Sequence, residues 1–141
     1  MADIPLPAPL WRRLVAGIYD GLLLAGLFLI AGWILVVGAS LSGLELDRLV
    51  SQLVYFSIGG LYFGLCWSNG GQTLGMKAWR LVLRRDDGAP LRLPIALLRY
   101  AGAWVSLMAL GLGFLWSMID ARRRAWHDLL AGTEMIQLPR G

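Results

Sequence analysis

An aspartate inside an apolar run is the first candidate for chemistry in this sequence. Asp20 is the only acidic or basic residue in the hydrophobic stretch at residues 14–39. If that stretch is a helix in a lipid bilayer, a carboxylate within it costs about 2.5–3.5 kcal/mol at mid-membrane. Such a group needs a partner, a proton or water. Asp20 is therefore predicted to be either a functional site or one half of a structural ion pair.

Arg13 lies seven residues before Asp20. Seven helical steps bring the two side chains onto nearly the same face, about 10.5 Å apart along the axis. That separation is too long for a direct bond, so each side chain is expected to meet its own partner on a neighbouring surface. The candidates are Arg99 for Asp20, and Asp120 or Asp128 for Arg13. An arginine suits such a site because its planar fork stays charged and can pair bidentately.

Other chemical motifs are weak. His127 stands beside Asp128 and could relay protons near neutral pH, but no nucleophile or further ligand gathers around it, which favours a structural role. Gly70, Gly71 and Gly75 are not followed by the Lys-Ser/Thr of a phosphate-binding loop. No cluster of His, Cys, Asp and Glu has metal-ligand spacing. The sequence predicts no enzyme active site, no metal site and no cofactor.

The composition indicates the elements that must hold these residues. Hydrophobic residues make up 57% of the 141 residues and charged residues 16%, against roughly 45–50% and about 25% in soluble chains. Residues 13–39, 49–67 and 95–119 are nearly free of charge, and each is near the ~20 residues that cross a bilayer. The fold class expected is an all-α membrane protein, a small transmembrane helix bundle in a single domain over residues 1–141.

The positive charges predict which side of the membrane each loop occupies. The net charge is +4, and basic residues gather at the ends of the apolar runs, in Arg12–Arg13, Lys77–Arg92 and Arg122–Arg124. This distribution fits the positive-inside rule better than a nucleic-acid footprint. The expected partner is the lipid bilayer and not nucleic acid, with the loop at residues 68–94 and the tail at 120–141 in the cytoplasm.

The path of the third apolar segment stays open at this point. Three straight crossings would put Arg122–Arg124 outside, against the positive-inside rule. A broken or re-entrant hairpin bent at Gly111–Gly113 would instead return the tail to the cytoplasm. A strand is predicted at Thr133–Leu138, and its residues Glu134–Leu138 could then pair with Leu81–Arg85 in a minor β element. The charges favour the second path.

Two pairs of glycines have the small-xxx-small spacing that lets helices approach closely in lipid. They are Gly17 with Gly21, and Gly60 with Gly64. The spacing fits helix packing within one chain, and equally a face for a homo-oligomer.

Four segments in a fixed order also carry a family resemblance: WRRLVAGIYDGLLL, GGQTLGMKAWRLVLRRDDG, LPIALLRYAG and GFLWSMIDARRRAWHDLLAGTEMI. Through them the chain resembles, over most of residues 9–136, the RDD family of small bacterial membrane proteins, named for one arginine and two aspartates. One feature differs from the family pattern. The family often has Gly-Lys after GQTxG, whereas here Met76 precedes Lys77.

The resemblance implies which residues are the family's conserved charges. It makes Arg13 the family arginine, Asp20 the first aspartate and Asp128 the second, with Asp120 a further acidic position. It also implies a multi-pass protein of the bacterial inner membrane that transports some ligand, and some members are linked to sodium–proton exchange.

Two functions follow as hypotheses. In the first, the chain is a transport-related protein in which Asp20 alternates between a proton and a cation, and a homo-oligomer or a membrane partner completes the pathway. A tight pair between Asp20 and Arg99 would argue against such exchange. In the second, the chain is a structural or accessory membrane protein whose buried charges fix helix packing.

Overall fold

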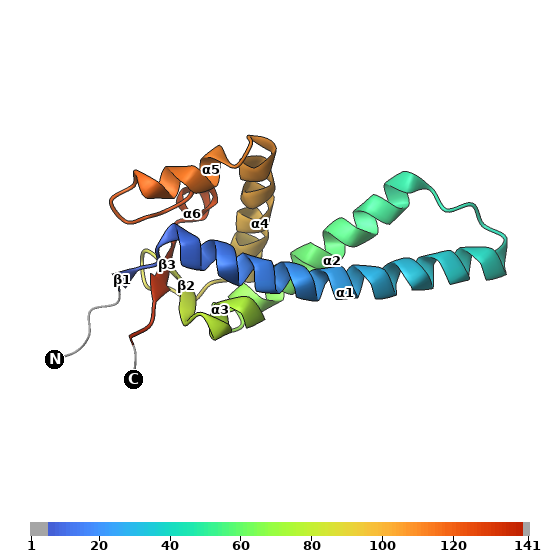
Figure 1. Ribbon diagram of the computed structural model, residues 1–141, viewed down its shortest axis with the longest axis horizontal. Helices are drawn as coiled ribbons and strands as arrows, with labels where there is room; N and C mark the ends of the chain where they lie inside the picture. Colours follow the sequence, from blue (N-terminus) through green and yellow to red (C-terminus); the bar gives the residue numbers. More distant parts are fainter. Residues whose placement is uncertain (1–5, 140–141) are drawn as a thin grey trace.

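The computed structural model describes residues 6–139. It divides into a long helical hairpin and a compact base, which consists of residues 6–9 and 69–139. Residues 1–5 and 140–141, which the predicted domain includes, lie outside the described residues. The hairpin consists of α1 (Leu10–Ser42) and α2 (Arg48–Ser68). Figure 1 shows that the base lies at the opposite end from the α1–α2 connection and contains the first and last strands, at residues 6–7 and 133–137.

Both hairpin helices are long and apolar enough to cross a membrane. Their large apolar side chains mostly point outward: Leu29 is 76% exposed and Trp33 is 69% exposed. So extensive an apolar surface is typical of a lipid-facing helix and not of a soluble domain. The predicted fold class is confirmed, and the molecule is a membrane protein. At about 1.5 Å per residue α1 reaches about 50 Å, so part of it extends beyond a ~30 Å hydrocarbon layer.

The connection between the two helices is set by local capping. α1 ends at Gly43, whose left-handed conformation (φ 68°) lets its backbone N–H return to the carbonyl of Ala39. α2 starts after Asp47, whose side chain accepts a hydrogen bond from the N–H of Leu49. The two helices diverge from the base toward this connection (Figure 1).

The third apolar segment is broken. It comprises α4 (Leu93–Met108), α5 (Leu112–Leu115) and the 3₁₀ turn η1 (Trp116–Met118), and its axis bends by 107° between Met108 and Leu112. Gly111 permits the bend because it adopts φ 77°, in the left-handed region. The broken path predicted at Gly111–Gly113 is therefore confirmed, and the straight third span over residues 95–119 is wrong.

The bend brings the tail back to the base, where it forms a small sheet. After the bend come the short helix α6 (Trp126–Ala131) and strand β3 (Thr133–Gln137). β3 lies in the middle of an antiparallel sheet, between β1 (Leu6–Pro7) and β2 (Leu81–Arg85). The predicted β element is thus confirmed: β3 starts at Thr133 as predicted and ends one residue before the predicted end at Leu138. The predicted loop also contains the short helix α3 (Leu74–Ala78).

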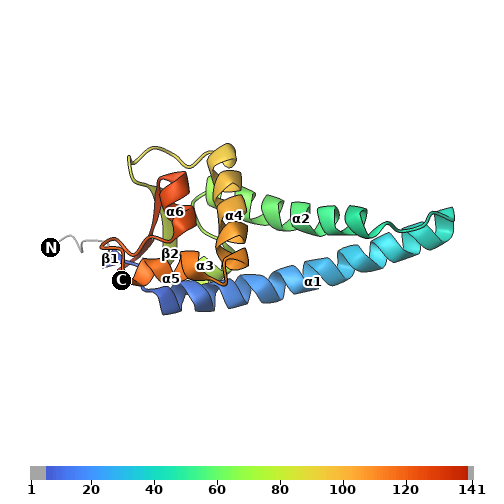
Figure 2. The same cartoon turned by 90° about the horizontal axis from the view of Figure 1, so that it is seen from above.

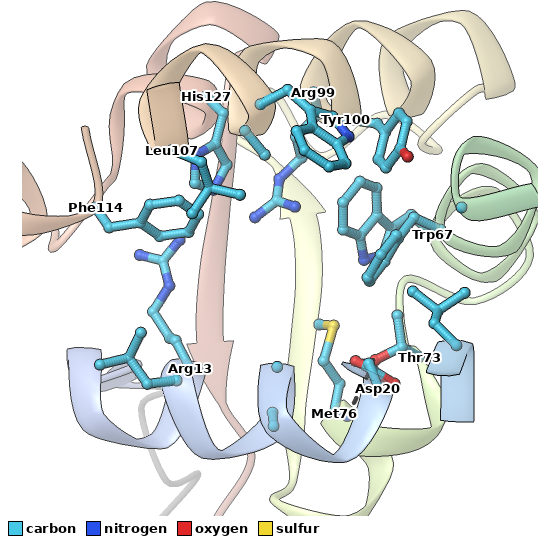
Figure 3. A pocket seen from close by; sticks show the side chains of 18 of the residues that line it. Arg13, Asp20, Trp67, Thr73, Met76, Arg99, Tyr100, Leu107, Phe114 and His127 are labelled. Atoms are coloured by element: carbon cyan, nitrogen blue, oxygen red, sulfur yellow. Dashed lines mark hydrogen bonds between the residues drawn. The ribbon is translucent and has the colours of Figure 1, made fainter. Parts of the chain in front are cut away.

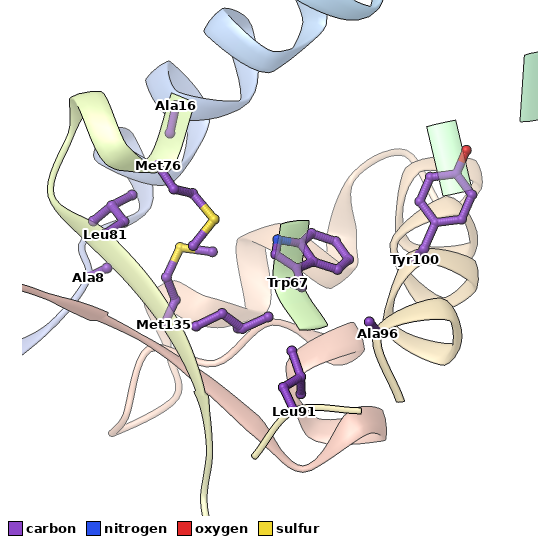
Figure 4. Close-up of a cluster of buried hydrophobic side chains, with 10 residues drawn as sticks. Ala8, Ala16, Trp67, Met76, Leu81, Leu91, Ala96, Tyr100 and Met135 are labelled. Atoms are coloured by element: carbon purple, nitrogen blue, oxygen red, sulfur yellow. The ribbon is translucent and has the colours of Figure 1, made fainter. Parts of the chain in front are cut away.

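A modest apolar core joins the base to the helices. It includes Trp67 from α2, Met76 from α3, Leu81 from β2 and Tyr100 from α4, all less than 10% exposed. Figure 4 shows Met76, Met135 and Trp67 in the middle of this cluster, with Leu81 and Tyr100 at its two ends. The core is what fixes the positions of the polar residues described below.

The two glycine pairs behave differently. Added Cβ atoms at Gly60 and Gly64 would meet Tyr100 or Leu97 at 3.3 Å or less, so this pair brings α2 against α4 within the chain. Added Cβ atoms at Gly17 and Gly21 would meet nothing within 4 Å among the described residues. The face of α1 that carries Gly17 and Gly21 is therefore open.

The arrangement predicts the membrane topology. In a Cys66→Ala background, cysteines at Ala121 and at Leu44 should react with an impermeant reagent from opposite faces of sealed vesicles. The reason is that Ala121 belongs to the base, whereas Leu44 lies in the α1–α2 connection. Permeabilised vesicles, in which both sites should react, provide the control. Labelling of both sites from the same face of sealed vesicles would contradict the arrangement.

Candidate functional site

A cavity of about 430 Å³ lies between the first turns of α1 and helix α4. Figure 3 shows α1 on one side of this cavity and α4 on the other, with the sheet behind and the end of α2 at the edge. Its volume is in the range of small-molecule sites, roughly 300–1,000 Å³. Most of its lining is apolar or aromatic; the charged side chains and the imidazole on its wall are those of Arg13, Asp20, Arg99 and His127.

A buried cluster of two arginines and an aspartate lies beside the cavity, and the two arginines line its wall. Arg99 of α4 donates to Oδ1 of Asp128 from Nε at 3.1 Å and from Nη2 at 2.7 Å. Arg13 of α1 donates to Oδ2 of the same carboxylate and, at 2.7 Å, to the carbonyl of Arg123. All three side chains are at most 5% exposed. The cluster links three elements that are far apart in the sequence.

Local structure holds Asp128 in place. It occupies the first turn of α6, where its Oδ2 accepts the backbone N–H of Ala125 at 2.9 Å and so satisfies the start of the helix. Burial raises the pKa of the Asp128 carboxyl, but the guanidinium groups of Arg99 and Arg13 lower it by more, leaving the pKa well below its ordinary value. Asp128 is therefore ionised throughout the physiological pH range.

His127 lies next to this cluster without joining it by a hydrogen bond. Its Nε2 is 3.6 Å from Oδ1 of Asp128, and its ring packs on Phe114 with centroids 4.8 Å apart. Burial, together with the positive charge of Arg99, lowers the pKa of His127 from 6.5 to about 3. The imidazole is thus neutral at pH 7, and proton relay near neutral pH is not favoured at this position.

The second polar site surrounds Asp20, which is 3% exposed. Its Oδ1 accepts the hydroxyl of Tyr62 at 2.8 Å and the backbone N–H of Gly75 at 2.9 Å. Its Oδ2 accepts the hydroxyl of Thr73 at 2.5 Å. Every one of these partners is uncharged, so within the described residues the Asp20 carboxylate has no basic partner.

The GQTLG segment at residues 71–75 supplies two of these donors, the Thr73 hydroxyl and the Gly75 N–H. Thr73 is the N-cap of α3, and its hydroxyl accepts the N–H of Met76 at 3.1 Å while donating to Asp20. Gly75 follows in the first turn. A Cβ there would lie 2.2 Å from the carbonyl oxygen of Ala16 and 3.0 Å from Cγ of Asp20, so only glycine allows α3 to approach α1 this closely.

The predicted pairings can now be compared with the contacts. Arg13 and Asp20 do meet separate partners, and Arg13 takes Asp128, one of its two candidates. The predicted pair of Asp20 with Arg99 is wrong, because the guanidinium of Arg99 is directed to Asp128. Asp120 lies outside the cavity, where it accepts the backbone N–H groups of residues 122 and 124 and the Arg124 side chain.

Sequence reasoning missed the partners of Asp20. Thr73 and Gly75 belong to a run that reads as turn formers, and Tyr62 lies in an apolar span. The signal that could have found Thr73 is its position as a threonine just before a short helical turn. Within residues 6–139 no group of three or more His, Cys, Asp or Glu could hold a metal ion.

A model described as the RDD family matches residues 7–132 of this sequence. The chain belongs to the RDD family. The match includes Arg13, Asp20 and Asp128, to which the resemblance assigns the family's arginine and two aspartates. No curated protein and no solved structure matches the RDD chain. In this RDD protein the arginine and the second aspartate form an ion pair, whereas the first aspartate is held by neutral donors.

The buried imidazole should make the stability of the RDD protein depend on pH. His127 is neutral when folded (pKa about 3) but gains a proton below about 6.5 when unfolded. The unfolded state therefore binds more protons between these values, and stability falls as the pH drops from 7 to 5, by about 2 kcal/mol from this residue. His127→Gln should flatten the pH dependence of the melting temperature in detergent over this interval. An equally steep dependence in the variant would contradict the assignment.

Proposed function

We propose that this RDD protein is a multi-pass protein of the bacterial inner membrane that takes part in the transport of an ion or small ligand and is not an enzyme. The observation that carries the proposal is the Asp20 carboxylate. It lies on the wall of a cavity, 3% exposed, and its hydrogen-bond partners are neutral. A buried carboxylate in a membrane protein is by default a candidate for ligand or proton handling.

The absence of an arginine at Asp20 among residues 6–139 supports exchange at this carboxylate. A fixed guanidinium neighbour holds a carboxylate in its charged form and occupies its oxygens, as Arg13 and Arg99 do at Asp128. Hydroxyl and amide donors stabilise the charge without supplying a counter-charge. In this proposal the missing positive charge at Asp20 is supplied in turn by a proton and by a cation. The oxygens of Tyr62 and Thr73 are the type of ligand that a hard cation prefers.

The orientation proposed is with the base in the cytoplasm. The basic blocks Arg12–Arg13, Lys77–Arg92 and Arg122–Arg124 all belong to the base or to the end of α1 that enters it. The α1–α2 connection carries Glu45, Asp47 and Arg48 and is less basic. The positive-inside rule then puts the base inside. A chain with two long helices encloses little volume, so we propose that further copies or a membrane partner complete the pathway.

A structural or accessory role is the second candidate, and it also has a specific observation in its favour. The Arg13–Asp128–Arg99 cluster links α1, α4 and α6 with fully buried charges. Such a cluster can fix helix packing without taking part in any flux. The two candidates differ in what they predict for Asp20, which is not part of this cluster.

The test is cation-driven proton flux in proteoliposomes, followed with a pH-sensitive dye. Asp20→Asn should abolish the flux while the protein still folds, because an amide can carry neither the proton nor the charge. Asp47→Asn is the matched control: this carboxylate is at the α2 N-cap, far from the cavity, and asparagine caps a helix equally well. Wild-type flux in folded Asp20→Asn protein would exclude exchange at this residue. Reduced folded yield in that variant, together with unchanged flux per folded molecule, would favour the structural role.

A further inference from the structure

The part of the cavity wall that contains Arg13 and Arg99 carries an excess of positive charge. Arg13 and Arg99 both line the cavity, whereas Asp128, which pairs with both, is fully buried and is not part of its wall. Two guanidinium groups face one carboxylate, and His127 beside them is neutral at pH 7. The cluster therefore has a net charge of one positive unit, and that charge is presented to the cavity. An uncompensated charge at an apolar site calls for an anionic partner.

Two nitrogen atoms of residues that line the cavity also lack hydrogen-bond partners. Among the described residues, the indole Nε1 of Trp67 and Nδ1 of His127 are buried without a hydrogen-bond partner, and both side chains line the cavity. Trp67 is 5% exposed, and the Arg99 guanidinium carbon lies 4.3 Å from the centre of its ring. A buried N–H without an acceptor is costly, so most such groups in proteins have a partner. An acceptor close to Arg99 would satisfy the indole.

The rest of the wall is apolar. Leu24 and Phe28 of α1 line it from one side, and Leu107 of α4 and Phe114 of α5 from the other. In Figure 3, Leu107 and Phe114 lie across the space from α1, and Arg13 and Arg99 point into it. A small inorganic anion could use the guanidinium groups but would leave these side chains without contacts. The lining thus suits a molecule with a polar head and a hydrocarbon body.

We propose that this cavity binds an amphiphile with a single negative charge, whose oxyanion head, a carboxylate or a phosphodiester, accepts hydrogen bonds from Arg99 and Trp67. Its hydrocarbon body lies between α1 and α4 against Leu24, Phe28 and Leu107. The single charge of the head matches the single excess charge of the cluster, and the planar guanidinium fork suits either oxyanion. The inference rests on the proposed function in one respect: it names the class of ligand that occupies the same cavity.

Binding to the purified full-length chain in a non-ionic detergent tests the proposal. Radiolabelled oleate, phosphatidylglycerol, phosphatidylcholine and oleyl alcohol are compared by equilibrium binding. At least one of the two anionic amphiphiles should bind at one molecule per chain. Oleyl alcohol, which has the same hydrocarbon body as oleate, should bind at least about tenfold more weakly than the anion, since it forgoes a charge-assisted hydrogen bond. Binding of oleate alone identifies a carboxylate head, and binding of phosphatidylglycerol alone a phosphodiester. Equal affinity for oleyl alcohol and the anions, or no binding of either anion, would overturn the proposal.

Two glycines offer a matched pair of variants for locating the site. Gly17 lines the cavity and Gly21, one turn later, does not, yet at both positions an added Cβ meets nothing within 4 Å. Gly17→Phe should fill the cavity and weaken binding by at least about tenfold, while Gly21→Phe should bind as the wild type does. Trp67→Phe keeps an aromatic ring under Arg99 and removes the N–H, so it should weaken binding by about tenfold. Unchanged binding in both Gly17→Phe and Trp67→Phe would show that the ligand lies elsewhere.

The Asp20→Asn variant separates this inference from the proposed function. It should bind the anionic amphiphile at least as tightly as the wild type, because the substitution removes a negative charge from the cavity wall. Binding without cation-driven flux in the wild type would overturn the exchange role alone. Flux without binding would overturn the anionic site alone.

Discussion

The Asp128 carboxylate accepts hydrogen bonds from two guanidinium groups that reach it from distant parts of the chain, Arg13 in α1 and Arg99 in α4. Removing three charges from water is expensive, and the cost is offset only when the geometry is good and the remaining polar atoms are satisfied. Here both carboxylate oxygens are used, and the backbone N–H of Ala125 adds a further donor. Removal of Asp128 would leave two buried guanidinium groups without a counter-charge. The contact therefore holds α1, α4 and α6 together and tolerates little displacement.

Much of the architecture is arranged so that this contact can form. Asp128 must return to the base, and the 107° bend before α5 turns the chain back toward it. β3 then joins the tail to β1 and β2, close to the start of α1 (Figure 2). The half of each hairpin helix next to the base packs against it, as Gly60 and Gly64 of α2 do against α4. The two parts of the molecule thus face different surroundings: the long helices face lipid, and the charged base faces water.

The two aspartates that share this fold have opposite environments. Asp128 is held by fixed positive charges and is ionised at any physiological pH. Asp20, across the cavity, is held by two hydroxyls and one amide, so its charge has no fixed counterpart among the described residues. A carboxylate paired with fixed arginines, like Asp128, is suited to a structural role. A carboxylate held by neutral donors, like Asp20, is suited to reversible binding of a proton or a cation.

The sequence could predict what depends on periodicity and solvent, and it failed where distant elements meet. The seven-residue spacing placed Arg13 and Asp20 on one face, and the conflict between hydropathy and charge in the third segment indicated the bend. The sequence could not predict the choice of partner. It offered Arg99 to Asp20, whereas the position of α6 places Asp128 against Arg99. The role of Gly75 also could not be predicted, because its close contact with Ala16 joins residues far apart in the sequence and has no local sequence signal.

The most direct measurement of the central constraint is a double-mutant cycle across Arg13 and Asp128. The free energy of unfolding in mixed micelles would be compared for the wild type, Arg13→Met, Asp128→Asn and the double variant. A cycle across the exposed pair Arg85 and Asp87 is the control and should show no measurable coupling. If Asp128 holds the two ends of the chain together, the coupling between it and Arg13 should exceed about 1 kcal/mol. Additive effects, within about 0.5 kcal/mol, would contradict the account.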